Sequence, residues 1–320
     1  MINEKLNWLS PSPHTDLDTV VWCGPIRFYL GRIQFNFHYS SALSYESVRF
    51  LERYYSRFSK PGFPVGSKVN IYYNLAPDSF SHPDHPVWRS HLPYRDFGQN
   101  SHGWQQIVER DFVAWYNEKS LDAYVMGPEL DPRSTDSLDN LLGMILPRLL
   151  LQDHTLIVHT NAIVRDNRAW LFYGPSGVGK STLADWCRRQ KGYKVIASDQ
   201  VLLNIDQEGL YAQALPYTIP EIPRDEESWE TRPVKVAGLI HLYRDARHYG
   251  VTRITPTEAL GPLASETISL DNSPLQAQPA FLLLTRALSR SGIILGKMSY
   301  PLGFDFWTWL DKIENADEEN

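Results

Sequence analysis

The sequence has few of the residues that build disulfide frameworks and structural zinc sites. Its 320 residues include only two cysteines, Cys23 and Cys187, which lie far apart in the chain. Two thiols cannot by themselves supply the four ligands of a structural zinc site, and their spacing is not that of a disulfide-rich domain. Because free thiols are typical of reducing compartments, we expect a cytoplasmic protein.

Positive charge and long apolar runs are also scarce. The formal net charge is −6, and lysine and arginine form no block, so the basic patch of a nucleic-acid-binding protein is missing. The longest apolar runs, such as Phe281–Leu284, are far shorter than the roughly 20 residues of a membrane-spanning helix. The first residues lack the pattern of a secretory signal. We therefore expect a soluble protein with neither nucleic acid nor membrane among its partners.

Apolar residues are plentiful, at 42% of the chain, so a packed core is expected. The pattern over 1–130 predicts a small α+β domain, because alternating runs typical of strands flank a helical run that Ser44 can cap. The elements expected in this part are a strand at 32–38, a helix at 45–57, a strand around 69–73, a loop over 76–106 and a hairpin of 112–116 with 121–126.

The rest of the chain, 131–320, predicts a second and larger domain. Asp166 and Asn167 form a tight turn, so the strands on either side should pair as an antiparallel hairpin. The elements expected here are a helix carrying Leu138 to Leu150, strands at 156–164 and 169–173, a helix at 182–190, a strand at 194–197, a loop over 208–232, a strand at 236–242, a helix starting at Pro256, and a final helix, strand and helix at 276–290, 292–297 and 304–314.

An uninterrupted match to G-x-x-x-x-G-K-[ST] lies between a predicted strand and a predicted helix, which is the context that a phosphate-binding loop requires. Its glycines let successive backbone N–H groups point at phosphate oxygens, and the helix N-terminus favours the same anion. Lys180 would reach the β- and γ-phosphates, and Ser181 would bind Mg²⁺. We predict binding of a nucleoside triphosphate, ATP with Mg²⁺. The predicted binding residues are Gly174, Pro175, Ser176, Gly177, Val178, Gly179, Lys180, Ser181 and Thr182.

An acidic residue follows the next predicted strand. KVIA is followed by Ser198 and Asp199, which puts one carboxylate beside the loop and facing the γ-phosphate. Asp199 could accept the proton of an attacking hydroxyl or hold Mg²⁺ directly or through water; a turn cap is the structural alternative. We predict Ser181 and Asp199 as metal ligands, and Asp199 and Lys180 as catalytic residues.

Three features of the stretch 154–205 resemble one family. They are His159 on the strand before the loop, the hairpin that leads directly into GPSGVGKST, and Asp199 at the end of the next strand. The family is that of the HPr kinase/phosphorylases and their HPr-kinase-related relatives, whose nucleotide domain is shared with phosphoenolpyruvate carboxykinases. The resemblance implies that His159 lies beside Asp199, tunes it or contacts phosphate, and is catalytic. A lone histidine on an alternating strand would otherwise be structural.

The fold class expected is α/β, or α+β overall. A small N-terminal α+β domain would precede a P-loop nucleotide-binding domain with a mixed sheet of the HPr kinase/phosphoenolpyruvate carboxykinase type. Two positions depart from that family. Ser198 stands where a second acid is common, and Val234–Gly238 lacks the acid of a Glu-x-Arg-Gly-like signature. The acidic residues that the family has at these positions for the reverse, phosphorolytic reaction and for a second metal site are therefore absent here. Candidates to neutralise charge in the transition state, with solvated surface positions as the alternative, are Lys235, Arg244 and Arg247.

These features predict an ATP- and Mg²⁺-dependent kinase that transfers the γ-phosphoryl group to a hydroxyl, a serine of a protein or peptide by the resemblance. The acceptor itself is not fixed by the fold. Two alternatives stay open: a kinase of small-molecule hydroxyls, and a non-catalytic nucleotide sensor or scaffold. The N-terminal domain and the 208–232 loop are expected to select the acceptor. The resemblance also implies a homo-oligomer, because the related kinases assemble through their nucleotide domains.

Overall fold

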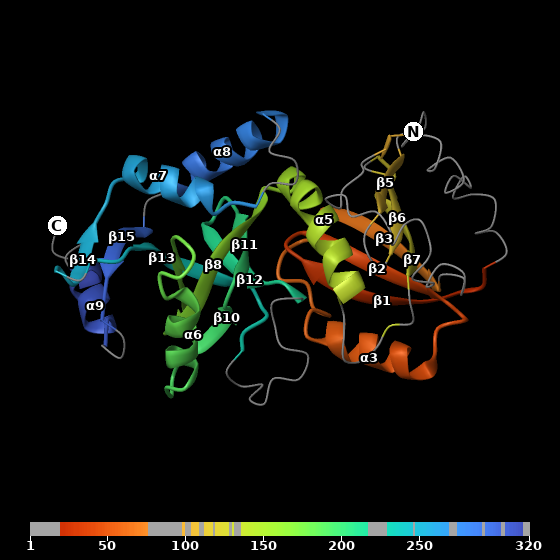
Figure 1. The fold of residues 1–320 in the computed structure, drawn as a ribbon, viewed down its shortest axis with the longest axis horizontal. Helices are drawn as coiled ribbons and strands as arrows, with labels where there is room; N and C mark the ends of the chain where they lie inside the picture. Colours follow the sequence, from red (N-terminus) through yellow and green to blue (C-terminus); the bar gives the residue numbers. More distant parts are fainter. Residues whose placement is uncertain are drawn as a thin grey trace. The chain divides into compact units, whose positions relative to one another are not determined.

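The structure is a computed structural model in which the chain forms two compact units, Met1–Ile145 and Leu146–Asn320, each with its own sheet (Figure 1). The boundary falls within helix α5 (Asp136–Gln152), whereas the division expected from sequence lies between 130 and 131. The residues that the structure describes are 20–75, 98–99, 104–108, 112–117, 119–127, 130, 136–216, 229–245, 247–268, 274–289, 292–301 and 305–315.

The first unit contains, within its described residues, a seven-stranded mixed sheet in the order β1-β2-β3-β7-β6-β5-β4. The pairs β2–β3 and β3–β7 are parallel, and the other neighbours are antiparallel. Helix α3 (Tyr45–Ser56) connects the parallel strands β2 and β3. The strands are β1 (Trp22–Leu30), β2 (Ile33–Ser40), β3 (Ser67–Leu75), β4 (Gly98–Gln99), β5 (Trp104–Val108), β6 (Val113–Asn117) and β7 (Asp122–Gly127).

Helix α3 begins where the sequence predicts it. The Ser44 hydroxyl accepts the backbone N–H of Ser47, which caps the helix, and Tyr55 stacks on Phe28 of β1 with ring centroids 4.1 Å apart. The predicted β6–β7 hairpin is confirmed. The loop predicted over 76–106 is wrong at 98–99, where β4 pairs with β5, and at the start of β5, which pairs with β6 along its whole length. Its sequence WQQIV has no alternating pattern that would have revealed the strand. Residues 76–97 and 100–103 of that predicted loop lie outside the described residues.

The second unit contains, within its described residues, an eight-stranded mixed sheet. Strand β9 pairs with β8 and β13, and the remaining order is β10-β8-β11-β12-β13-β15-β14. The strands are β8 (Thr155–Arg165), β9 (Arg168–Tyr173), β10 (Lys194–Ala197), β11 (Gln200–Ile205), β12 (Leu210–Ala214), β13 (Val234–Leu242), β14 (Gly250–Arg253) and β15 (Ile294–Ser299). Strands β9, β13 and β15 run parallel to one another, so their carboxyl ends lie at one edge of the sheet.

The hairpin of β8 and β9 is confirmed. Asp166 and Asn167 have φ values of 51° and 58°, as the two central residues of a tight hairpin turn require. The loop predicted over 208–232 is wrong at its start, because β12 pairs with β11 over its full length and buries most of its side chains. Residues 217–228 of that predicted loop lie outside the described residues.

Helices cover the second sheet and complete its core. Helix α6 packs on β8 and β10, α7 packs against α8, and α9 packs near β14 (Figure 1). Trp307 and Leu310 of α9 join Phe172 of β9 in one buried cluster. None of the described helices is long and apolar enough to cross a membrane. The predicted α+β fold class, with a mixed sheet in the second unit, is confirmed. The bounds of these described helices are α6 (Lys180–Arg188), α7 (Pro256–Ser265), α8 (Pro274–Leu288) and α9 (Trp307–Asn315).

Candidate functional site

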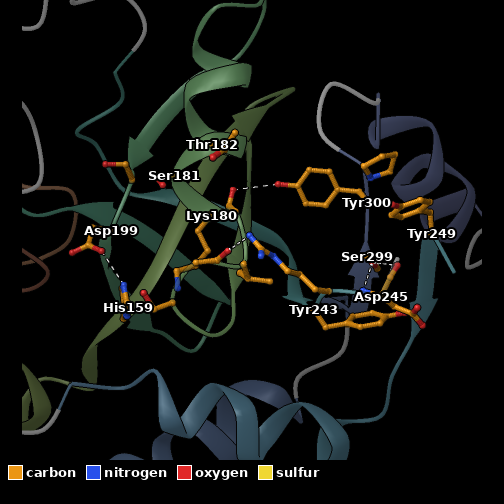
Figure 2. A pocket seen from close by; sticks show the side chains of 17 residues that line it. His159, Lys180, Ser181, Thr182, Asp199, Tyr243, Asp245, Tyr249, Ser299 and Tyr300 are labelled. Carbon is orange, nitrogen blue, oxygen red and sulfur yellow. Dashed lines mark hydrogen bonds and ion pairs between the residues drawn. The ribbon is translucent and has the colours of Figure 1, made fainter. Parts of the chain in front are cut away.

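A cavity of about 580 Å³ lies at the carboxyl ends of the three parallel strands (Figure 2). The segments that follow β9, β13 and β15 all contribute to its wall. Open α/β sheets bind their ligands at this edge, so the topology alone favours a binding site here. The lining residues are 176–182, 198–199, 243–245, 299–301, His159 and Tyr249.

The loop between β9 and α6 takes a conformation that suits glycine. Gly174 has a φ of +143° and Gly177 a φ of +75°, a region that other residues rarely adopt. Helix α6 then begins at Lys180 with Gly179 as its N-cap, and no side chain of the described residues caps it. Since the first N–H groups of a helix need partners from outside the helix, this end of α6 suits an anion such as phosphate.

Lys180 lies folded against the loop. The residue is only 7% exposed, and its ammonium group donates to the carbonyl oxygen of Gly174. The backbone carbonyl of Lys180 accepts from the side-chain amide of buried Asn161 on β8. Asn161, which sequence analysis missed, therefore ties the start of α6 to the sheet. The amino-acid pattern gave no signal for it, because its partner is the backbone of a helix from further along the chain that packs on β8.

Two side chains from the segments after β13 and β15 form the opposite wall of the cavity and contact the backbone of the loop. The hydroxyl of Tyr300, just after β15, donates to the carbonyl of Gly179 over 3.2 Å. Burial, with a smaller effect of Cys187, raises the pKa of Tyr300 to about 12, so this donor keeps its proton at neutral pH. The guanidinium group of Arg244, just after β13, donates to the carbonyl of Gly177. Arg244 is thus placed at the cavity, as a charge-neutralising residue would have to be.

On the β8 side of the loop, a histidine lies between two carboxylates. His159 Nε2 lies 2.9 Å from Asp199 Oδ1, and His159 Nδ1 lies 3.1 Å from Glu266 Oε2. The side chains of His159 and Asp199 are 37% and 62% exposed, whereas that of Glu266 is only 11% exposed. In Figure 2, Asp199 and His159 lie to one side of Lys180, and Tyr300, Tyr249 and Asp245 lie to the other.

The structure brings most of the predicted site residues together. His159, Asp199 and the loop from Ser176 to Thr182 line the cavity, while Gly174 and Pro175 form the base of the loop outside that lining. Three residues were predicted to neutralise charge in the transition state. Of these, Arg244 lines the cavity, whereas Lys235 on β13 lies beside Gly209. Arg247 is exposed and donates its backbone N–H to Asp245.

The predicted metal ligands Ser181 and Asp199 are both among the residues with side-chain oxygens that line the cavity. Hydroxyl and carboxylate oxygens are ligands that Mg²⁺ prefers, and this ion takes few protein ligands because it keeps water and substrate phosphates. No group of three or more histidine, cysteine, aspartate or glutamate side chains among the described residues is arranged to hold a metal ion. The residues present fit a metal shared with phosphate oxygens.

Replacing Gly174 by alanine should distort the loop. A Cβ atom there would lie 2.5 Å from the carbonyl oxygen of Leu242, and the φ of +143° is unfavourable for alanine. We expect a loss of about 1–3 kcal/mol in the free energy of unfolding, measured by chemical denaturation, and at least ~10-fold weaker binding of ATP, the nucleotide predicted from the sequence, measured by calorimetry. The matched control is Gly261→Ala inside α7, where nothing lies within 4 Å of the new Cβ; alanine favours a helix there. Equal behaviour of the two variants would contradict this expectation.

No family model matches the chain, and no curated protein matches it. Among solved structures, one match is the HPr(Ser) kinase/phosphatase from Coxiella burnetii. This match has 14% sequence identity and a TM-score of 0.30, and it covers 51% of this chain and 95% of that chain. The chemistry of the site follows from its own residues.

Proposed function

We propose that this chain is an ATP- and Mg²⁺-dependent phosphotransferase that moves the γ-phosphoryl group to a hydroxyl, with a serine of a protein or peptide as acceptor. The observation that supports it is one cavity that combines an uncapped helix N-terminus behind a glycine loop, the ammonium group of Lys180 and the carboxylate of Asp199. Phosphoryl transfer needs positioning, charge neutralisation and a group that orients the attacking hydroxyl. The choice of serine rests on the sequence resemblance at His159, the loop and Asp199.

Each residue has a definite part in this proposal. The loop N–H groups bind phosphate oxygens, and the Lys180 ammonium group leaves the Gly174 carbonyl to reach the β- and γ-phosphates. Ser181 would hold Mg²⁺ directly and Asp199 would hold it through water, and the ion would neutralise negative charge on the transferring group. Asp199 accepts the hydroxyl proton as the acceptor oxygen bonds to the γ-phosphorus and the bond to the β-phosphate oxygen breaks. The same proposal includes a cytoplasmic location, selection of the acceptor by the N-terminal domain, and assembly as a homo-oligomer.

One observation favours a second candidate, a nucleotide sensor that binds ATP without transferring phosphate. Ser198 lines the cavity next to Asp199, so a single carboxylate stands where the resembling family commonly has two. A kinase acting on small-molecule hydroxyls shares every feature of the loop and differs only in the acceptor. The serine kinase, the small-molecule kinase and the nucleotide sensor therefore differ in the product that each would form.

Incubating the chain with γ-labelled ATP, Mg²⁺ and two acceptor pools separates these functions. One pool contains serine peptides and the other contains small hydroxyl compounds, and a Lys180→Ala preparation controls for contaminating kinases. We expect labelled phosphoserine, identified by mass spectrometry. A phosphorylated small molecule would establish the metabolite kinase instead, and ATP binding in calorimetry without any product would establish the sensor. Failure to bind ATP at all would overturn the proposal.

A further inference from the structure

Glu266 occupies a position at the site that no sequence pattern indicated. It is the C-cap residue of α7, and its carboxylate is nearly buried against the His159 ring. The residue does not line the cavity; it lies behind His159, on the side away from Asp199. A carboxylate that is held near an imidazole and away from the ligand is placed to act through that imidazole.

The backbone fixes Glu266 to strand β8. The N–H of His159 donates to the carbonyl of Glu266 over 2.7 Å, and the N–H of Ile268 donates to the carbonyl of Ile157 over 2.9 Å. Thr267 forms an antiparallel bridge with Val158 between these two bonds. These contacts involve backbone atoms, so they survive substitution of the Glu266 side chain. The side chain can therefore be tested separately from the local fold.

The ion pair between Glu266 and His159 restricts the ring. Glu266 Oε2 lies 3.1 Å from His159 Nδ1, within reach of an N–H at that ring nitrogen, and a carboxylate oxygen can only accept. With Nδ1 held in this way, the opposite ring nitrogen, Nε2, is directed at Asp199 over 2.9 Å. Asp199 is the most exposed of the three side chains, and exposed carboxylates have several accessible rotamers. A fixed His159 ring would keep one carboxylate oxygen of Asp199 in place and leave the other oxygen free to face the cavity.

We propose that Glu266 is a positioning residue: it fixes the orientation of the His159 ring, which in turn orients the Asp199 carboxylate toward the acceptor hydroxyl. The inference rests on the proposed function as a phosphotransferase. Carboxylate–histidine pairs of this kind orient reacting groups in unrelated enzymes, where the outer carboxylate holds the imidazole tautomer and does not itself react. Here the outer carboxylate comes from a helix end that the sheet pairing carries to β8.

Two substitutions and a matched control test this role. Glu266→Leu removes the acceptor for Nδ1–H, and Glu266→Gln retains one oxygen acceptor. The control, Glu258→Gln, makes the same chemical change in the first turn of α7, where Glu258 closes a capping box with Thr255 that glutamine can also form. The measurements are kcat, the KM for ATP in the presence of Mg²⁺, and proton–nitrogen spectra of ¹⁵N-histidine-labelled protein, with His159→Gln used to assign the ring signals.

We expect Glu266→Leu to lower kcat by about 10- to 100-fold, as the loss of a supporting hydrogen bond does elsewhere, with the KM for ATP changed by less than about two-fold. Glu266→Gln should retain more activity than Glu266→Leu, and Glu258→Gln should match the wild type. In the spectra, the His159 ring signals of Glu266→Leu should differ from those of the wild type, because the contact at Nδ1 is lost.

Wild-type kcat together with unchanged His159 ring signals in both Glu266 variants would overturn the inference. If Glu266→Leu unfolds, Glu266→Gln decides by the same two measurements. The spectra do not need turnover. A wild-type chain that binds ATP without forming a product therefore refutes the phosphotransferase function alone, while the ring signals still decide whether Glu266 positions His159.

Discussion

Lys180→Ala is expected to abolish nucleotide binding or turnover. The ammonium group is the cation that the loop holds at its centre, bound to the Gly174 carbonyl and nearly buried. In a phosphate-binding loop this lysine reaches the β- and γ-phosphates. Hydrogen bonds that involve a charged group are about twice as strong as neutral ones. Without this charge, the phosphates contact only backbone N–H donors and the partial positive charge of the helix N-terminus. These groups are fixed in the backbone and cannot move with the phosphoryl group as it is transferred.

The measurement is a calorimetric titration with ATP and Mg²⁺, followed by an assay of product formation. Lys191→Ala is the control, because this lysine is exposed on the turn after α6 and does not line the cavity. Lys191→Ala should bind and turn over ATP like the wild type. Wild-type binding and turnover in Lys180→Ala would remove the loop from the proposed function, and with it the assignment of the phosphate site.

Asp199→Asn is expected to keep ATP binding and to lower phosphoryl transfer by roughly 100-fold or more, the size of a general-base contribution. Asparagine has nearly the same shape and can still contact His159, but its amide cannot take a proton from the attacking hydroxyl. Because the Asp199 side chain is 62% exposed, the substitution should change the free energy of unfolding little. The effect should therefore fall on kcat and not on folding.

Steady-state kinetics with saturating ATP and Mg²⁺ measure this effect. The control is Asp185→Asn, which removes an exposed carboxylate that pairs with Arg188 within helix α6; exposed pairs contribute little to stability. A decrease in kcat for Asp199→Asn but not for Asp185→Asn is the expected pattern. Unchanged turnover in Asp199→Asn would exclude this carboxylate from the chemistry, and the positioning role of Glu266 would then have no target.

Some features of the site could be recognised because their physical cause is local. The loop motif depends on glycines and a lysine within one short stretch, and the turn at Asp166 and Asn167 depends on two residues that tolerate positive φ. The cap at Ser44 is equally local. Each of these signals involves neighbours in the chain, so no knowledge of the sheet was needed to predict them.

Other features depend on pairing between distant segments and were missed. Glu266 contacts His159 only because the residues after α7 pair with β8. Tyr300 reaches Gly179 because β15 runs parallel to β13, which in turn runs parallel to β9. Strand β12 was predicted as loop because Pro and charged residues dominate the rest of its segment, while the strand itself is stabilised by its ladder with β11.

The sequence by itself determined that a glycine loop with one lysine stands between a strand and a helix, with one carboxylate after the next strand. Only the tertiary structure decided which side chains surround that loop: Asn161 and Tyr300 hold its backbone, and Glu266 supports His159 behind Asp199. The physical reason is that backbone conformation follows from neighbouring residues, whereas the partners of a side chain follow from strand order and register. A local sequence pattern fixes register only within a hairpin, through its turn, and does not specify which distant strands pair.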